Sequence, residues 1–82
     1  MSEREPEAGQ QTVTDICRID APYRREVVLQ DVVFESGMRL LRVRIREGKA
    51  RFTILDLDAA TSEAWGRQMI EWARQAKGEG AT

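Results

Sequence analysis

The chain has 82 residues and a formal net charge of −1, and 41% of its residues are hydrophobic while 33% are charged. A chain of this length forms one small domain and buries only about 60–65% of the surface that its unfolded form exposes, so its core has little margin. The composition excludes an intrinsically disordered chain, and no apolar run approaches the roughly 18–20 residues that a membrane span requires. We therefore expect a small folded domain that does not cross or bind a membrane.

The first residues read M-S-E-R-E-P-E, which is acidic and polar, whereas a secretory signal has a basic start followed by an apolar stretch. The single cysteine, Cys17, cannot form an internal disulfide, and small secreted domains usually depend on disulfides. Both features indicate a reducing compartment, so the expected location is the cytoplasm.

The N-terminal quarter has no regular pattern. Residues 1–12 contain Pro6, Gly9 and polar side chains without apolar periodicity, which predicts a disordered start. From Val13 to Ile19 the apolar residues fit neither the helical nor the strand period. The segment is therefore either a loosely packed arm or a short extra strand, and we favour the arm. The predicted organisation is an arm over 1–22, a domain over 23–78 and a disordered end over 79–82.

Three strands are predicted next. Residues 25–35 are rich in β-branched and aromatic side chains, residues 38–47 alternate apolar residues with arginines, and residues 50–57 form a third such run. Ser36-Gly37 and Gly48-Lys49 lie between these runs, and glycine suits the positive φ of two-residue hairpin turns. The pattern therefore predicts a three-stranded antiparallel meander.

Two-residue turns would fix the register of the meander. Val28 would then lie opposite Ile45, and Ile45 opposite Phe52, on one apolar face that forms the core. The other face would carry the arginines of the central strand, with Asp31 opposite Arg42 as a cross-strand ion pair.

A helix should follow the third strand. Asp58 is a good N-cap for a helix that begins at Ala59 and runs to about Lys77, where Gly78 ends it.

One side of this helix is apolar. Trp65, Met69 and Trp72 recur at spacings of four and three, and this stripe should pack on the core face of the sheet. Gly66 costs the helix roughly 1 kcal/mol relative to alanine, and close approach of the helix to the sheet would account for it. The predicted fold class is α+β, a three-stranded antiparallel meander with one C-terminal helix packed on one face (βββα).

The run F-E-S-G-M-R-L-L-R-V-R-I-R-E-G at residues 34–48, followed by F-T-I-L-D-L-D at residues 52–58 and a helix with Trp65, resembles a family of short bacterial proteins of unknown function. The resemblance covers roughly residues 25–74. It implies no activity, cofactor, partner or functional residue.

The sequence offers little catalytic chemistry. It contains no histidine, the commonest general base near neutral pH and the commonest metal ligand. Cys17 therefore has no histidine to activate it as a nucleophile. Asp56 and Asp58 could hold a hard cation, but a strand-end carboxylate and an N-cap explain them better. We expect no enzymatic activity, no cofactor, no metal and no small-molecule substrate.

The predicted arginine face also carries aliphatic residues, and arginine beside apolar side chains is typical of protein interfaces. We therefore expect a self-association surface, or one for another protein, and the alternative is nucleic-acid binding by Arg42, Arg44 and Arg46. No aromatic residue interleaves these arginines, and the chain is slightly acidic, so nucleic acid is the weaker interpretation. The predicted interaction surface comprises Leu29, Asp31, Leu40, Arg42, Arg44, Arg46, Arg51 and Leu55.

Overall fold

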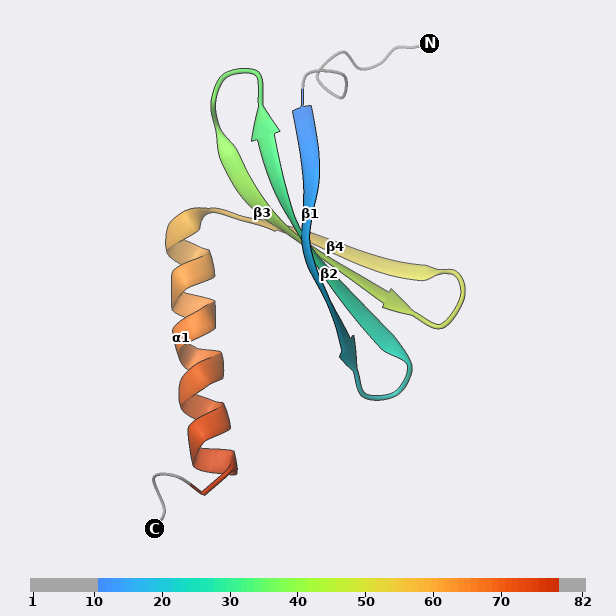
Figure 1. Ribbon diagram of the computed structural model, residues 1–82, viewed down its shortest axis with the longest axis vertical. Helices are drawn as coiled ribbons and strands as arrows, with labels where there is room; N and C mark the ends of the chain where they lie inside the picture. Colours follow the sequence, from blue (N-terminus) through green and yellow to red (C-terminus); the bar gives the residue numbers. More distant parts are fainter. Residues whose placement is uncertain (1–10, 79–82) are drawn as a thin grey trace.

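A computed structural model of the chain describes residues 11–78. Four antiparallel strands are followed by one helix: β1 (Gln11–Ala21), β2 (Arg25–Phe34), β3 (Arg39–Glu47), β4 (Arg51–Leu57) and α1 (Ala59–Ala76). The strands form one sheet in the order β1-β2-β3-β4, a strongly twisted meander (Figure 1). The predicted α+β class is confirmed, but the sheet has four strands rather than three.

The additional strand is β1, so the prediction of a loosely packed arm is wrong. β1 pairs with β2 from Gln11 to Ala21, and its register shifts between Asp15 and Cys17. Such a bulge inserts one residue, here Ile16, and breaks the alternation along the strand. The apolar residues of this segment therefore do not alternate regularly along the sequence, although the segment forms a strand. The predictions for residues 1–10 and 79–82 lie outside the described residues, whereas Gln11 and Thr12 belong to β1.

Both predicted two-residue turns contain three residues. In the first, the Gly37 amide donates to the Phe34 carbonyl at 2.8 Å and the Phe34 amide donates to the Met38 carbonyl at 2.9 Å. Gly37 has φ +96°, and a three-residue hairpin loop needs a residue with positive φ at this place. In the second, Glu47 pairs with Arg51, so the loop is residues 48–50.

The longer turns shift both registers by one residue. Val28 lies opposite Arg44 rather than Ile45, and Ile45 lies opposite Thr53 rather than Phe52. A shift of one residue moves every side chain of a strand to the other face of the sheet. The side chains of β2 and β4 that were predicted to share a face with Leu41, Val43 and Ile45 of β3 therefore lie on the same face as its arginines.

Two faces result, and they are named here by their residues. The arginine face contains Glu26, Val28, Gln30 and Val32 of β2, Leu40, Arg42, Arg44 and Arg46 of β3, and Phe52, Ile54 and Asp56 of β4. The helix face contains Arg25, Val27, Leu29, Asp31 and Val33 of β2, Arg39, Leu41, Val43, Ile45 and Glu47 of β3, and Arg51, Thr53, Leu55 and Leu57 of β4.

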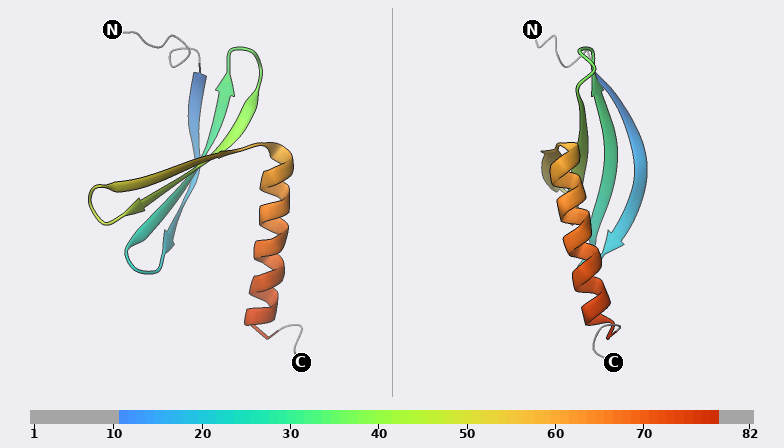
Figure 2. Two further views of the ribbon diagram at one scale, coloured as in Figure 1. Left: turned by 180° about the vertical axis from the view of Figure 1, so that it is seen from behind. Right: turned by 90° about the vertical axis from the view of Figure 1, so that its left-hand side faces the viewer.

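The helix has the predicted ends. Asp58 is the N-cap, since its Oδ1 accepts a hydrogen bond from the Thr61 amide at 2.8 Å. At the other end, Lys77 caps the helix and Gly78 follows with φ +85°. α1 lies on one side of the sheet, where its main contacts are with β3 (Figure 2). No helix within residues 11–78 has the length and apolar character needed to cross a membrane.

The hydrophobic core is very small. Among the described residues only Val28, Val32 and Val43 are buried apolar side chains, and only Val32 is completely buried. Val28 and Val32 belong to the arginine face, where no helix covers them, and Val43 belongs to the helix face. Twelve large hydrophobic side chains of the described residues are exposed, from β1, β4, α1 and the turns. The helix therefore leaves most of the sheet and most of its own apolar side uncovered.

Candidate protein-interaction surface

An apolar groove lies between α1 and the helix face of the sheet. Its volume is about 340 Å³. Nearly all of its wall is aliphatic or aromatic, and among the described residues that line it Ser62 alone has a hydroxyl. The lining residues are Ile19, Val27, Leu29, Leu41, Val43, Leu57, Ser62, Trp65, Gly66 and Met69. The groove is concave and apolar, a character that ligand-binding sites commonly have.

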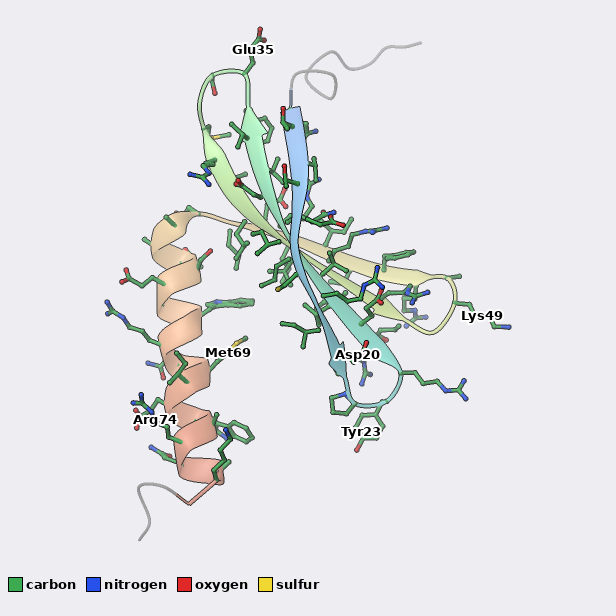
Figure 3. The ribbon with its side chains drawn as sticks, in the orientation of Figure 1. Asp20, Tyr23, Glu35, Lys49, Met69 and Arg74 are labelled. Carbon is green, nitrogen blue, oxygen red and sulfur yellow. The ribbon has the colours of Figure 1, made fainter. Side chains whose placement is uncertain are left out.

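The apolar stripe of α1 faces this groove without filling it. Trp65 is 41% exposed, Met69 62% and Trp72 70%. Met69 points from the helix toward the sheet while Arg74 points away from it (Figure 3). The stripe thus has the predicted direction, but the prediction that both tryptophans are core residues is wrong for this chain by itself.

The groove continues toward the turn between β1 and β2. Trp72 and Ala73 of the helix and Ile19, Ala21 and Pro22 of β1 and its turn line this second, more open part. Sequence reasoning did not place Ile19 in any site because β1 had been interpreted as an arm. The signal was present, since Val13, Ile16 and Ile19 give this segment an apolar content unusual for a disordered arm.

Gly66 lies in the middle of the helix stripe and lines the groove. A Cβ atom added to Gly66 would meet no atom within 4 Å. Close approach to the sheet, the explanation suggested by the sequence, is therefore wrong. Within one chain the glycine costs helix stability and makes no contact that requires it.

The arginine face is engaged in pairings of its own. The Arg42 guanidinium donates to both carboxylate oxygens of Asp56, at 2.8 and 3.1 Å. Arg46 lies 3.4 Å from the Glu26 carboxylate, which also pairs with Arg18 of β1 at 3.2 Å. Two of the three predicted phosphate-binding arginines therefore already have carboxylate partners.

Arg44, the middle residue of the row, has an apolar role. Its guanidinium stacks over the Phe52 ring, 4.6 Å from the ring centroid. Its cross-strand partner on β2 is Val28, which is 9% exposed and is flanked on β1 by Arg18. Because arginine stems can cover apolar surface, Arg44 and Arg18 explain how Val28 is buried without a helix above it.

The arginine face is also balanced in charge once β1 is included. Four basic side chains lie on it with four acidic ones: Arg18, Arg42, Arg44 and Arg46, and Asp15, Asp20, Glu26 and Asp56. The face is therefore not a positively charged surface of the kind that nucleic-acid phosphates require.

The predicted interaction surface is divided between the two faces. Leu40, Arg42, Arg44 and Arg46 lie on the arginine face, whereas Leu29, Asp31, Arg51 and Leu55 lie on the helix face. Asp31 pairs with Arg39 at 3.0 Å rather than with Arg42. Of the predicted residues, Leu29 is the one that lines the groove.

The carboxylates of Asp56 and Asp58 act separately. The hydrogen bonds from Arg42 lower the pKa of Asp56, and hydrogen bonds from the side chain and the amide of Thr61 lower the pKa of Asp58. The two side chains thus serve as an ion-pair partner and a helix cap. Cys17 lies exposed on β1.

Comparison with known proteins places the chain in a family. The model of a family of unknown function, DUF6967, matches residues 10–75. No curated protein matches the chain, and no solved structure matches it. Since the match spans most of the sequence and all five structural elements but the last residue of α1, the chain belongs to this family.

Proposed function

We propose that this member of DUF6967 is a protein-association module that binds its partner through the apolar groove and the α1 stripe. The observation that carries the proposal is the exposure of Trp65, Met69 and Trp72 above an open apolar groove. Monomeric soluble proteins rarely leave contiguous apolar surface of this kind in water. Tryptophan and methionine are also among the residues enriched in protein interfaces.

The proposed site favours binding over catalysis because of its chemistry. Among the described residues that line the groove between α1 and the sheet, Ser62 has the only hydroxyl, which donates to the Asp58 carbonyl at 2.8 Å, and none is acidic, basic or a thiol. An apolar groove can exclude water and bury a partner's side chains, whereas proton transfer or nucleophilic attack needs a positioned base.

The arrangement of the arginine face favours protein association at the groove over nucleic-acid binding. A phosphate contact would have to displace Asp56 from Arg42 and Glu26 from Arg46, and the acidic residues of that face would repel the nucleic-acid backbone. The helix face has ion pairs of its own, Asp31 with Arg39 and Arg25 with Glu47, but none of these four residues lines the apolar groove.

Sedimentation velocity over a range of concentrations tests the proposal, together with capture of partners from the native host. Trp72→Ser should keep its circular dichroism and lose association, because Trp72 is mostly exposed in the single chain. Tyr23→Ser is the control, since Tyr23 is an exposed aromatic residue at the β1–β2 turn that lines no part of the groove.

The proposal fails if the parent remains monomeric at millimolar concentration and captures nothing that Trp72→Ser loses. Retention of RNA or DNA by the parent, with an affinity that falls steeply as salt rises, would replace it by nucleic-acid binding.

A further inference from the structure

We infer that α1 is a hinged lid, which closes on its own sheet by rotation at the junction of Leu57 and Asp58, and that the open arrangement in the structure is the one that admits a partner. This inference rests on the proposed function, because it adds the regulation of the same groove. Three observations support it: the groove widens along the helix, α1 is attached at one end, and the space between the two walls is free and apolar.

The groove widens with distance from the start of α1. The exposed fraction of the stripe residues rises from 41% at Trp65 to 62% at Met69 and 70% at Trp72. The volume also grows, from about 340 Å³ in the part that Trp65 lines to about 750 Å³ in the part that Trp72 lines. Ile19 and Met69 line both parts, so the two parts are continuous. A helix that touches the sheet at its first turns and splays away at its far end produces this shape.

One covalent junction connects α1 to the sheet. β4 ends at Leu57, the N-cap is Asp58 and the helix begins at Ala59, so no loop lies between strand and helix. The Thr61 amide and the Ser62 hydroxyl both donate to Asp58, at 2.8 Å each, so Asp58 moves with the first turn of the helix. Rotation of the backbone between Leu57 and Asp58 therefore swings the helix as a rigid body, and residues at the ends of elements commonly act as hinges.

The polar contacts of the helix do not oppose this movement. Glu63 pairs with Arg67 at 2.7 Å and Gln75 donates to Glu71 at 3.0 Å, so both contacts lie within α1 and move with it. At about 1.5 Å per residue Trp72 lies about 22 Å along the helix from the junction, so a rotation of about 15° moves it by about 6 Å. A small rotation is therefore enough to change the width of the groove at its wide end.

The two walls of the groove suit contact with each other. The described residues that line its narrow part are all uncharged, and closure buries their apolar surface, which is favourable in water. A Cβ atom on Gly66 would meet no atom within 4 Å, so the helix backbone has room to approach the sheet at that level. In the wide part Asp20 is exposed and shares the arginine face with Glu26, so closure leaves its carboxylate in water.

Closure and partner binding compete for the same surface. The stripe and the sheet wall can cover each other or contact a partner, but they cannot do both. A partner that binds only the open form has an apparent affinity that is reduced by the fraction of open chains. The free chain thereby shields its apolar groove, and a partner must shift the population toward the open form.

An engineered disulfide at the wide end tests the closure. Ala21 at the end of β1 and Ala73 on α1 line opposite walls there. In a Cys17→Ser background, Ala21→Cys with Ala73→Cys should form an intramolecular disulfide in dilute solution, because closure brings the walls together and a disulfide needs Cα atoms within about 7 Å. Ala21→Cys with Arg74→Cys is the matched control. Arg74 points away from the sheet (Figure 3), so the thiols of the control pair should stay reduced.

The locked chain tests the regulation. Oxidised Ala21→Cys/Ala73→Cys should lose association or partner capture by at least about tenfold, because the fraction of open chains falls toward zero. A reductant should restore both properties. The reduced form of the same chain is the control for the effect of the two substitutions themselves.

Fluorescence of Trp72 tests closure without new cysteines. Trp65→Phe leaves Trp72 as the single tryptophan of the chain. Trp72 is 70% exposed in the open arrangement, so closure should shift its emission to shorter wavelength and reduce its quenching by acrylamide. Circular dichroism checks that the variant is folded, and sedimentation at the same concentration checks that it is monomeric.

The outcomes separate this inference from the function on which it rests. The inference fails if the Ala21/Ala73 pair oxidises no faster than the control pair, or if Trp72 of the monomer emits as in the unfolded chain, and partner capture by the parent would then leave the proposed function standing. It also fails if the oxidised chain associates as tightly as the reduced chain. A parent that neither self-associates nor captures a partner overturns the proposed function, whereas the disulfide and the fluorescence still decide whether α1 closes.

Discussion

At the scale of single residues, each arginine of the row on β3 has a structural task in the monomer. Arg42 holds Asp56 in a two-point contact, Arg46 pairs with Glu26, and Arg44 stacks on Phe52. Planar guanidinium groups suit such contacts, because they present paired donors to a carboxylate and a flat surface to a ring. An alternating arginine pattern therefore does not by itself indicate a binding surface.

The contact between Arg42 and Asp56 predicts a dependence of stability on pH. Hydrogen bonds from Arg42 lower the pKa of Asp56 below its ordinary value of 3.8. Because the folded-state pKa is lower than the unfolded one, the stabilisation is present above the unfolded pKa and is lost as the pH falls through the folded pKa. Asp56→Asn should cost up to about 1 kcal/mol at neutral pH and reduce the loss of stability on acidification below about pH 4.

Denaturant unfolding at a series of pH values measures this effect. Arg42→Gln removes the same ion pair from the other side and should reproduce the result. The acid dependence should not vanish, because Asp31 and Asp58 also have lowered pKa values, caused by Arg39 and by the side chain and amide of Thr61. Equal acid dependence in Asp56→Asn and the parent would contradict the prediction.

At the scale of elements, β1 changes the interpretation of the sheet. It covers one edge of β2 along its whole length and brings Ile16 and Ile19 to the side of the sheet where α1 lies. Without β1, the Val32 side chain would lose its neighbour Val13, and an edge rich in valine would be open to other chains.

Removing β1 should therefore destabilise the domain. A chain that begins at residue 22 should unfold at lower denaturant concentration by more than about 1 kcal/mol, or aggregate, because surface changes alone usually stay within about 0.5 kcal/mol. Removal of residues 1–10 is the control, since it leaves β1 intact and we predict little change. Equal unfolding midpoints for the two truncated chains would show that β1 adds nothing to stability.

At the scale of the whole molecule, the domain has two unequal apolar clusters. One is a closed cluster under the arginine face, around Val28 and Val32, and the other is the open groove between α1 and the helix face. The closed cluster explains how a single chain holds its sheet together. The open groove is the surface on which an association would add most to stability.

Charge reversal at Arg44 separates the two faces as interfaces. Arg44→Glu should lose the stacking on Phe52, at a cost of about 0.5–1 kcal/mol, and remain folded. If partners bind at the groove, its association should equal that of the parent, because Arg44 lies on the opposite face of the sheet. Sedimentation velocity beside circular dichroism measures both properties, and a loss of association in Arg44→Glu would favour the arginine face.

The sequence by itself determined the elements that depend on local chemistry. The strands β2, β3 and β4 followed from β-branched runs, and α1 followed from its N-cap at Asp58, its apolar stripe and the glycine after its end. These signals could be recognised because caps, turn glycines and periodicity act within a few residues of the chain.

Only the tertiary structure decided which faces meet. Gly37 indicated a turn, but it did not show whether the loop has two residues or three. The one additional loop residue decided that Val28 lies opposite Arg44 rather than Ile45. The bulge at Ile16 concealed β1 for the same reason, since one inserted residue reverses the alternation on which strand recognition depends. The candidate surface depended on these registers, so the sequence could identify its tryptophans but could not place Trp65 beside Ile19 and Leu29, or Trp72 beside Ile19.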